Sequence, residues 1–139
     1  MGELMLFACG AGILLADQWC KRAVWVRGTV YNRRLSAIVR FRLVEHREGA
    51  YERTGARVAL VLAWVLAAAS ATILHRFGAW FHSAAALDGL GLAFGGAASN
   101  LLDILRRRYV VDFIDLGWWP VFNLADAAIL TGLAAALWN

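Results

Sequence analysis

Four aspartates interrupt long apolar stretches of the sequence, and they are Asp17, Asp88, Asp103 and Asp126. An ionisable side chain within an apolar membrane span is costly, so each is a candidate functional residue. Asp103 and Asp126 share a pattern, because each follows an asparagine by three residues, Asn100 and Asn123 respectively. Residues three apart lie on one face of a helix, so two such helices side by side would bring the two carboxylates together.

A pair of close carboxylates can catalyse the hydrolysis of a peptide bond. In a low dielectric the two groups cannot easily ionise together, so one keeps its proton. The ionised partner takes a proton from water while the protonated partner polarises the scissile carbonyl, as in aspartic proteases. Two alternatives stay open at this point: unrelated polar residues solvated at helix ends, and a metal site. The metal site is the weaker alternative, because the three histidines fall elsewhere, at His46, His75 and His82.

The elements that position these residues are predicted to be membrane helices. Of the 139 residues, 61% are hydrophobic, against about 45–50% in soluble domains. This excludes a disordered chain, a disulfide-rich secreted module and a typical soluble enzyme. A membrane-crossing helix needs about 20 apolar residues, and four stretches offer them, at about residues 4–26, 58–74, 80–105 and 121–138. We therefore predict an all-α membrane protein of one domain, residues 1–139, with four transmembrane helices.

Residues 27–57, between the first two predicted helices, are expected to form a small β platform on the membrane surface. Apolar and basic residues alternate from Ile38 to Val44, and a period of two is typical of a half-exposed strand. With four antiparallel helices, this segment and residues 106–120 share one side of the membrane. We therefore expect the two segments to be neighbours in space.

The basic residues are concentrated on that same side. All fourteen Lys and Arg residues fall in three places: ten between Lys21 and Arg57, one at Arg76, and three at Arg106–Arg108. The positive-inside rule would place this side in the cytoplasm. On a membrane surface these residues are expected to meet lipid phosphates, at about 1 kcal/mol each, rather than nucleic acid.

Four glycines in the third predicted helix, Gly89, Gly91, Gly95 and Gly96, suggest close helix packing. Gly91 and Gly95 are four residues apart, a spacing that lets a neighbouring membrane helix approach closely. The alternative is that membrane helices simply tolerate glycine.

Several motifs resemble the lipoprotein signal peptidase (signal peptidase II) family. They are DQWCK at residues 17–21, GGAASNLLD at 95–103, YVVDFID at 109–115 and PVFNLAD at 120–126. The resemblance extends from the first predicted helix to the last, and the C-terminal motifs have the order and spacing of the family.

The resemblance implies a four-helix aspartic endopeptidase of the bacterial inner membrane, with no metal or other cofactor. It would act as a monomer among membrane lipids, without nucleic acid, on prolipoproteins, which it cleaves before the cysteine that carries diacylglycerol. Asp103 and Asp126 would be the catalytic pair. Supporting or substrate-binding positions would be Asn100, Asn123, Asp17, Lys21, Arg47, Gly49 and Asp112. The family's active site faces the periplasm, and we prefer this orientation to the one that the charge distribution suggests.

The sequence departs from the family pattern at three positions. Ile104 stands where the family usually has an arginine, Arg47 where it has a substrate-contacting asparagine, and Cys20 where it has a threonine. Two alternatives to a working peptidase therefore remain. One is a catalytically impaired paralogue that binds lipopeptides or partner proteins without cleavage. The other is a small transporter with Asp103 and Asp126 as a proton relay, which the surface platform and the lack of inverted repeats disfavour.

Overall fold

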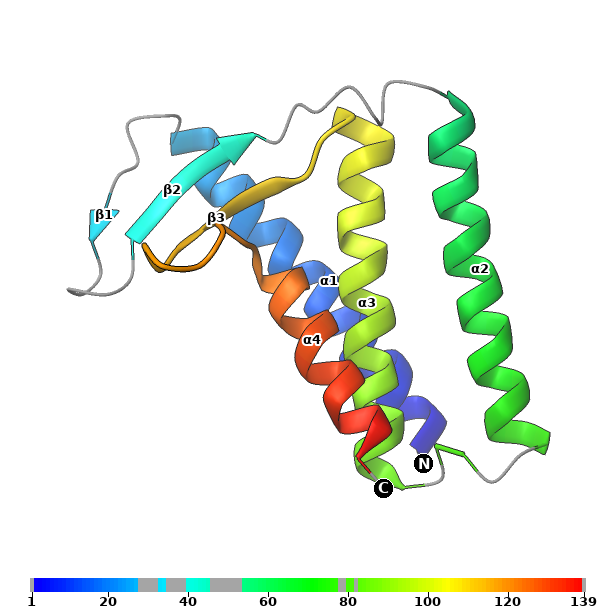
Figure 1. Ribbon diagram of the computed structural model, residues 1–139. Helices are drawn as coiled ribbons and strands as arrows, with labels where there is room; N and C mark the ends of the chain where they lie inside the picture. Colours follow the sequence, from blue (N-terminus) through cyan, green and yellow to red (C-terminus); the bar gives the residue numbers. More distant parts are fainter. Residues whose placement is uncertain are drawn as a thin grey trace.

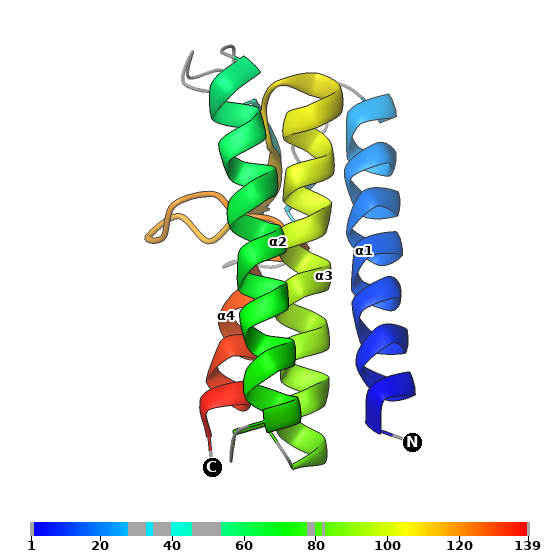
Figure 2. The ribbon, with the colours of Figure 1, turned by 90° about the vertical axis from the view of Figure 1, so that its right-hand side faces the viewer.

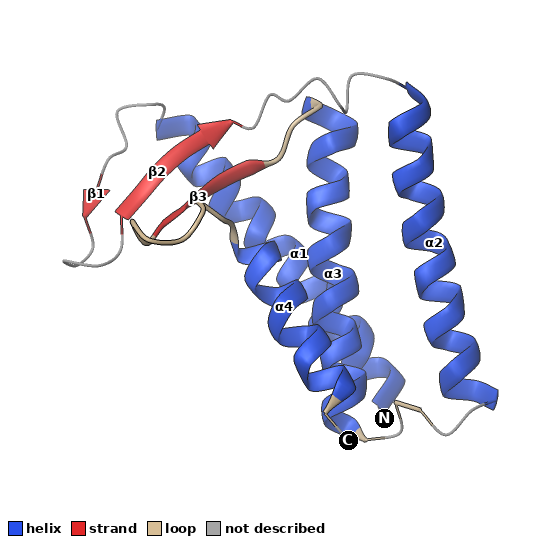
Figure 3. Cartoon of the chain, in the orientation of Figure 1, coloured by secondary structure: helices blue, strands red, loops and turns tan. Residues whose placement is uncertain are grey.

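Four helices stand side by side and a small sheet lies against one end of the bundle (Figures 1 and 3). The computed structural model describes residues 2–27, 33–34, 40–45, 54–77, 80–81 and 83–138. The helices are α1 (Gly2–Arg27), α2 (Thr54–Phe77), α3 (Ala84–Arg107) and α4 (Leu124–Leu137). The strands are β1 (Arg33–Arg34), β2 (Arg40–Glu45) and β3 (Val111–Asp115).

The helix α3 is central, and glycines on two of its faces let its neighbours approach closely (Figure 2). A Cβ atom at Gly91 or Gly95 would collide with backbone atoms of α1, and one at Gly89 or Gly96 with backbone atoms of α4. Any side chain at these positions would push the helices apart. The predicted role of the four glycines in close packing is therefore confirmed.

The helix α2 stands apart from the other three. None of its residues is buried. It packs mainly on α3, and an exposed ion pair joins Arg76 Nη2 to Glu3 Oε1 of α1 at 3.1 Å. Trp64 stacks edge-on against Phe94, with the ring centroids 6.1 Å apart, and its Nε1 donates a hydrogen bond to the Phe94 carbonyl at 3.3 Å. Two open apolar cavities flank this contact, one of about 500 Å³ towards α1 and one of about 450 Å³ towards α4.

Two helices are long and apolar enough to cross a membrane, by their length and composition: α1, over Gly2–Val26, and α2. The apolar helix α4 has 14 residues and is shorter. The predicted crossing by all four helices therefore stays a prediction for α3 and α4.

The sheet joins two segments that are far apart in the sequence. Its order is β1-β2-β3, with antiparallel pairing throughout, and β2 pairs with β3 from Arg40–Asp115 to Glu45–Val111. The strand predicted from the alternation before Val44 is confirmed as β2. The platform is not formed by residues 27–57 alone, because β3 comes from the α3–α4 connection, which confirms that these segments are neighbours.

Three helices start three or four residues away from the predicted positions. Helix α2 begins at Thr54 instead of about 58, and local structure sets the later starts of α3 and α4. We predicted a helix from residue 80, but Phe81 has a φ of 59° and the Ser83 side chain accepts a hydrogen bond from Ala86 N at 3.1 Å. Helix α3 therefore begins after this N-cap. We predicted the last helix from residue 121, but Phe122 forms a β-bridge with Ile114, so α4 begins only after this extended segment.

Candidate active site

A buried cluster of charges joins α1 to α3 at the end of the bundle near the sheet. Lys21 Nζ lies 2.7 Å from Asp17 Oδ2, one turn earlier on α1, and 2.8 Å from Asp103 Oδ2 on α3. The side chains of Lys21, Asp17 and Asp103 are at most 1% exposed. Buried charges of this kind persist only when they are paired and hydrogen-bonded, and here each carboxylate faces the ammonium group.

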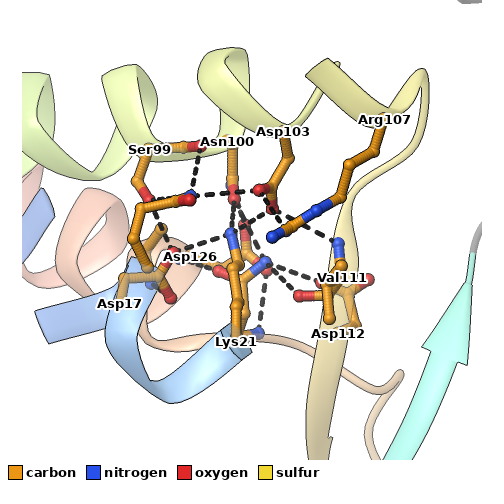
Figure 4. A network of polar contacts seen from close by, with 12 residues as sticks. Asp17, Lys21, Ser99, Asn100, Asp103, Arg107, Val111, Asp112 and Asp126 are labelled. Carbon is orange, nitrogen blue, oxygen red and sulfur yellow. Dashed lines mark hydrogen bonds and ion pairs between the residues drawn. The ribbon is translucent and has the colours of Figure 1, made fainter. Parts of the chain in front are cut away.

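Asp103 has no oxygen left for a substrate. Its Oδ1 accepts from Arg107 Nη1 at 2.8 Å and Gln18 Nε2 at 3.0 Å, while Oδ2 faces Lys21 and lies 3.4 Å from Val111 N. All these partners are protein groups, and the carboxylate is enclosed (Figure 4). Through these contacts Asp103 holds α1, α3 and β3 together.

Arg107 supplies a guanidinium next to Asp103, although Ile104 stands where the family usually has an arginine. The family usually has an arginine directly after this aspartate, and here the guanidinium comes from one turn further along α3. Arg107 also lies over the Trp25 ring, with Cζ 5.7 Å from its centroid. Ile104 itself is buried and lines the cavity between α2 and α4.

Asp17 connects the charge cluster to α4. Its Oδ2 accepts a hydrogen bond from Ser99 Oγ at 2.7 Å, and its Oδ1 accepts one from Ala125 N at 3.0 Å. Ala125 is in the first turn of α4, where backbone N–H groups lack partners within the helix. A side chain of α1 thus caps the N-terminus of α4 and fixes its position in the bundle.

Asn123 and Asp126 form a capping box at the start of α4. Asn123 Oδ1 accepts from Asp126 N at 2.9 Å, and Asp126 Oδ2 accepts from Asn123 N at 3.1 Å. The sequence predicted that both residues lie inside a helix, on one face, with Asp126 about five residues after the helix start. That prediction is wrong, because Asn123 is the N-cap and Asp126 lies in the first turn.

Asn100 links the charge cluster to Asp126. Its Nδ2 donates to Asp126 Oδ1 at 2.7 Å, and its Oδ1 accepts from Lys21 Nζ at 2.7 Å and from Asn123 Nδ2 at 3.1 Å. Asp126 is half-buried, and both its oxygens accept hydrogen bonds from uncharged groups. The two predicted Asn-x-x-Asp pairs do meet, but the asparagine of one contacts the aspartate of the other.

Asp112 lies next to this arrangement on β3. Asn123 Nδ2 donates to Asp112 Oδ1 at 2.7 Å, so Asn123 is bonded to both Asp112 and Asp126. The expected direct pairing of Asp103 with Asp126 is not seen among the described residues, because Asn100 and Lys21 lie between them (Figure 4). The spacing argument considered helices only, so it did not find Asp112, which the resemblance had given merely a supporting place.

An apolar cavity reaches this polar site from the side of the bundle. It lies between α2 and α4, and its lining includes Asn100, Leu101, Ile104 and Leu133. Such a wall suits a hydrocarbon chain or an apolar peptide, with Asn100 as a polar group in the lining.

The remaining predicted positions lie away from this network or outside the described residues. Arg47 and Gly49 belong to the residues outside the described ranges. Asp88 lies in the first half of α3, where it accepts a hydrogen bond from Cys9 Sγ at 4.0 Å. Within the described ranges, no group of three or more His, Cys, Asp or Glu side chains could hold a metal.

Within its described residues the chain is mostly helical, and two of its helices are long and apolar enough to cross a membrane. Two solved structures of a bacterial membrane enzyme, obtained in meso at 1.9 and 2.3 Å resolution, match the fold with TM-scores of 0.78 and 0.76. Each covers 94% of this chain, which covers 88% and 83% of those chains, at 18% identity. The profile of the family described as signal peptidase (SPase) II matches residues 10–139. The chain therefore belongs to the signal peptidase II family.

Individual relatives carry the name lipoprotein signal peptidase. The protein from Rhodococcus jostii is 32% identical over 149 residues, which cover 94% of this chain and 69% of the relative. Those from Syntrophomonas wolfei and Pelotomaculum thermopropionicum are 56% and 60% identical over 55 and 50 residues. These shorter matches span 37% and 33% of the relatives' own length, about a third.

Proposed function

We propose that this chain is an intramembrane aspartic endopeptidase that removes signal peptides from prolipoproteins, cleaving before the cysteine that carries diacylglycerol. Membership of the signal peptidase II family supports the reaction and the substrate class. One observation of the structure supports the aspartic mechanism: Asp112 and Asp126 are both hydrogen-bonded to Asn123. Asn100, which donates a hydrogen bond to Asp126, lines an apolar cavity.

The proposed catalytic pair is Asp112 and Asp126, which changes the partner that the sequence suggested for Asp126. Asp103 is saturated by two cations, an amide and a backbone N–H. A carboxylate that must bind water needs an accessible oxygen. Asp103 is 1% exposed, whereas Asp112 is 8% exposed and Asp126 is half-buried. Asp103 then acts as the anchor that fixes α1 against α3.

The proposed reaction needs only the two carboxyl groups and one water molecule. The ionised carboxylate removes a proton from water, whose oxygen bonds to the scissile carbonyl carbon, while the protonated carboxyl gives its proton to the carbonyl oxygen. The C–N bond then breaks as the nitrogen takes up the proton from the first carboxyl, and a hydroxyl on the former carbonyl carbon returns its proton to the second carboxylate. The pair is thereby restored to one ionised and one protonated carboxyl. The products are a signal peptide with a new carboxylate and a lipoprotein with a free amino group on its cysteine.

The apolar surfaces support a substrate that approaches from within the membrane. The cavity between α2 and α4 would take an acyl chain or the apolar signal segment and guide the peptide bond towards Asp126. In this proposal all four helices cross the bacterial inner membrane, and the sheet and the site lie on the periplasmic side. The protein acts as a monomer and uses no cofactor.

The test is a gel-shift cleavage assay on a diacylglyceryl-modified precursor with purified protein. Wild type is expected to release the signal peptide, and Asp112→Asn and Asp126→Asn are expected to release none. The matched control is Asp115→Asn, on the same strand, whose carboxylate accepts a hydrogen bond from Gly117 N, and it should cleave normally. Wild type that binds the precursor without cutting it would instead support the impaired-paralogue alternative.

A further inference from the structure

The side-chain amide of Asn100 bridges the buried ammonium of Lys21 and the carboxylate of Asp126 through hydrogen bonds. Its oxygen faces two donors, Lys21 Nζ and Asn123 Nδ2, and its nitrogen faces Asp126 Oδ1. An amide has a donor end and an acceptor end, so its orientation depends on what lies at each end. Donors at one end and a carboxylate at the other allow only one orientation here.

Lys21 provides the stronger constraint on that orientation. An ammonium has three N–H donors, and those of Lys21 point to Asp17 at 2.7 Å, Asp103 at 2.8 Å and Asn100 at 2.7 Å. The side chain is 0% exposed, so water cannot replace any of these partners. A hydrogen bond from a charged donor is about twice as strong as a neutral one, and the second donor to Asn100 lies further away, at 3.1 Å.

We propose that Lys21 is a positioning residue for catalysis, which acts on Asp126 through Asn100. This inference rests on the proposed function. Lys21 touches neither Asp126 nor substrate, and its effect is to hold the Asn100 amide so that Nδ2 donates to Asp126 Oδ1. When the ammonium is removed, Asn100 keeps its longer contact with Asn123 Nδ2 at the oxygen end. Asp126 Oδ1 then loses a fixed donor, while Asn123 N still donates to Oδ2.

The test is a double-mutant cycle on kcat with Lys21→Met and Asn100→Ala. Each single variant is expected to lower kcat about 10²-fold with KM little changed, the size of loss that a small misplacement of a reacting group causes. The double variant is expected to be no worse than Asn100→Ala, because Lys21 acts only through that amide. Losses that multiply in the double variant would overturn the proposal.

A destabilised control separates positioning from general damage to the fold. Val24→Ala alters a buried side chain of the same helix, one turn after Lys21, and should lower stability while kcat per folded molecule is unchanged. The same cycle is run in parallel with Lys21→Gln, which also removes the ammonium. If Lys21→Met does not fold, the cycle with Lys21→Gln tests the proposal.

A second readout needs no substrate. The side-chain amide signal of Asn100 in ¹⁵N-labelled protein, identified by its absence from Asn100→Ala, should shift in Lys21→Met in the direction seen in Asp126→Asn, while Val24→Ala leaves it unchanged. An Asn100 signal that stays at its wild-type position in Lys21→Met would overturn the proposal. An inert wild type would refute the peptidase function alone, since this signal still tests the link from Lys21 to Asp126.

Discussion

Replacing Asp103 and Asp126 by asparagine should separate a structural carboxylate from a catalytic one. Asp103→Asn removes the negative charge that lies 2.8 Å from Lys21 Nζ and 2.8 Å from Arg107 Nη1. The new amide nitrogen would also face an ammonium or guanidinium donor. Asp126→Asn removes a carboxylate whose partners are the uncharged donors Asn100 Nδ2 and Asn123 N.

The expected losses of unfolding free energy differ about threefold between the two variants. Removing one partner of a buried ion pair costs about 3–5 kcal/mol, because a charge is left uncompensated. Lys21 keeps Asp17, and the Arg107 side chain is 23% exposed, so we expect Asp103→Asn to lower the free energy of unfolding by about 3 kcal/mol. For Asp126→Asn we expect about 1 kcal/mol, because one hydrogen bond to a carboxylate is lost.

The two variants should show opposite patterns in stability and activity. The free energy of unfolding is measured by denaturant titration in micelles, and cleavage is measured per folded molecule in the same preparations. Asp126→Asn should be nearly as stable as wild type and inactive, whereas Asp103→Asn should be much less stable and retain measurable cleavage. An Asp103→Asn variant that is as stable as wild type, or an active Asp126→Asn variant, would refute the reasoning.

Three further predictions follow from the packing. Gly95→Ala should lower the free energy of unfolding by about 1–3 kcal/mol through overpacking against α1. The control Gly12→Ala should be neutral or stabilising, because a Cβ atom at Gly12 meets nothing within 4 Å. Equal effects of the two substitutions on unfolding would contradict the close-packing account. Trp64→Phe should cost about 1 kcal/mol of unfolding free energy through loss of its hydrogen bond to α3, and an unchanged unfolding curve would show that this bond does not hold α2. Asn123→Ser keeps an N-cap side chain but removes the buried amide nitrogen that donates to Asn100 and Asp112. The free energy of unfolding should fall by about 1–3 kcal/mol while cleavage per folded molecule is lost; full activity would exclude a role for that amide.

The apolar pattern was sufficient to predict the helices, because burial in a membrane or bundle depends on long runs of apolar residues. The alternation before Val44 likewise predicted β2, and the glycines of α3 predicted close packing. Helix starts were predicted poorly, because they depend on single capping side chains such as Ser83 and Asn123.

The residues that make up the site were easier to predict than the contacts that they make with one another. The motifs identified Asp103, Asp112 and Asp126 as members of one region, and the structure places all three around the junction of α3, β3 and α4. Spacing along a helix gives the depth of a residue but not the charges that neutralise it. Lys21 and Arg107 take up the oxygens of Asp103, and no local pattern distinguishes such an anchored carboxylate from an accessible one.

Mass spectrometry of the products from a diacylglyceryl-modified precursor tests the central claim most directly. For wild type we predict two fragments, with the cut immediately before the lipidated cysteine, and for Asp112→Asn only the intact precursor. Cleavage at another bond, or the same two fragments from Asp112→Asn, would contradict the proposal that Asp112 and Asp126 form the catalytic pair of a lipoprotein signal peptidase.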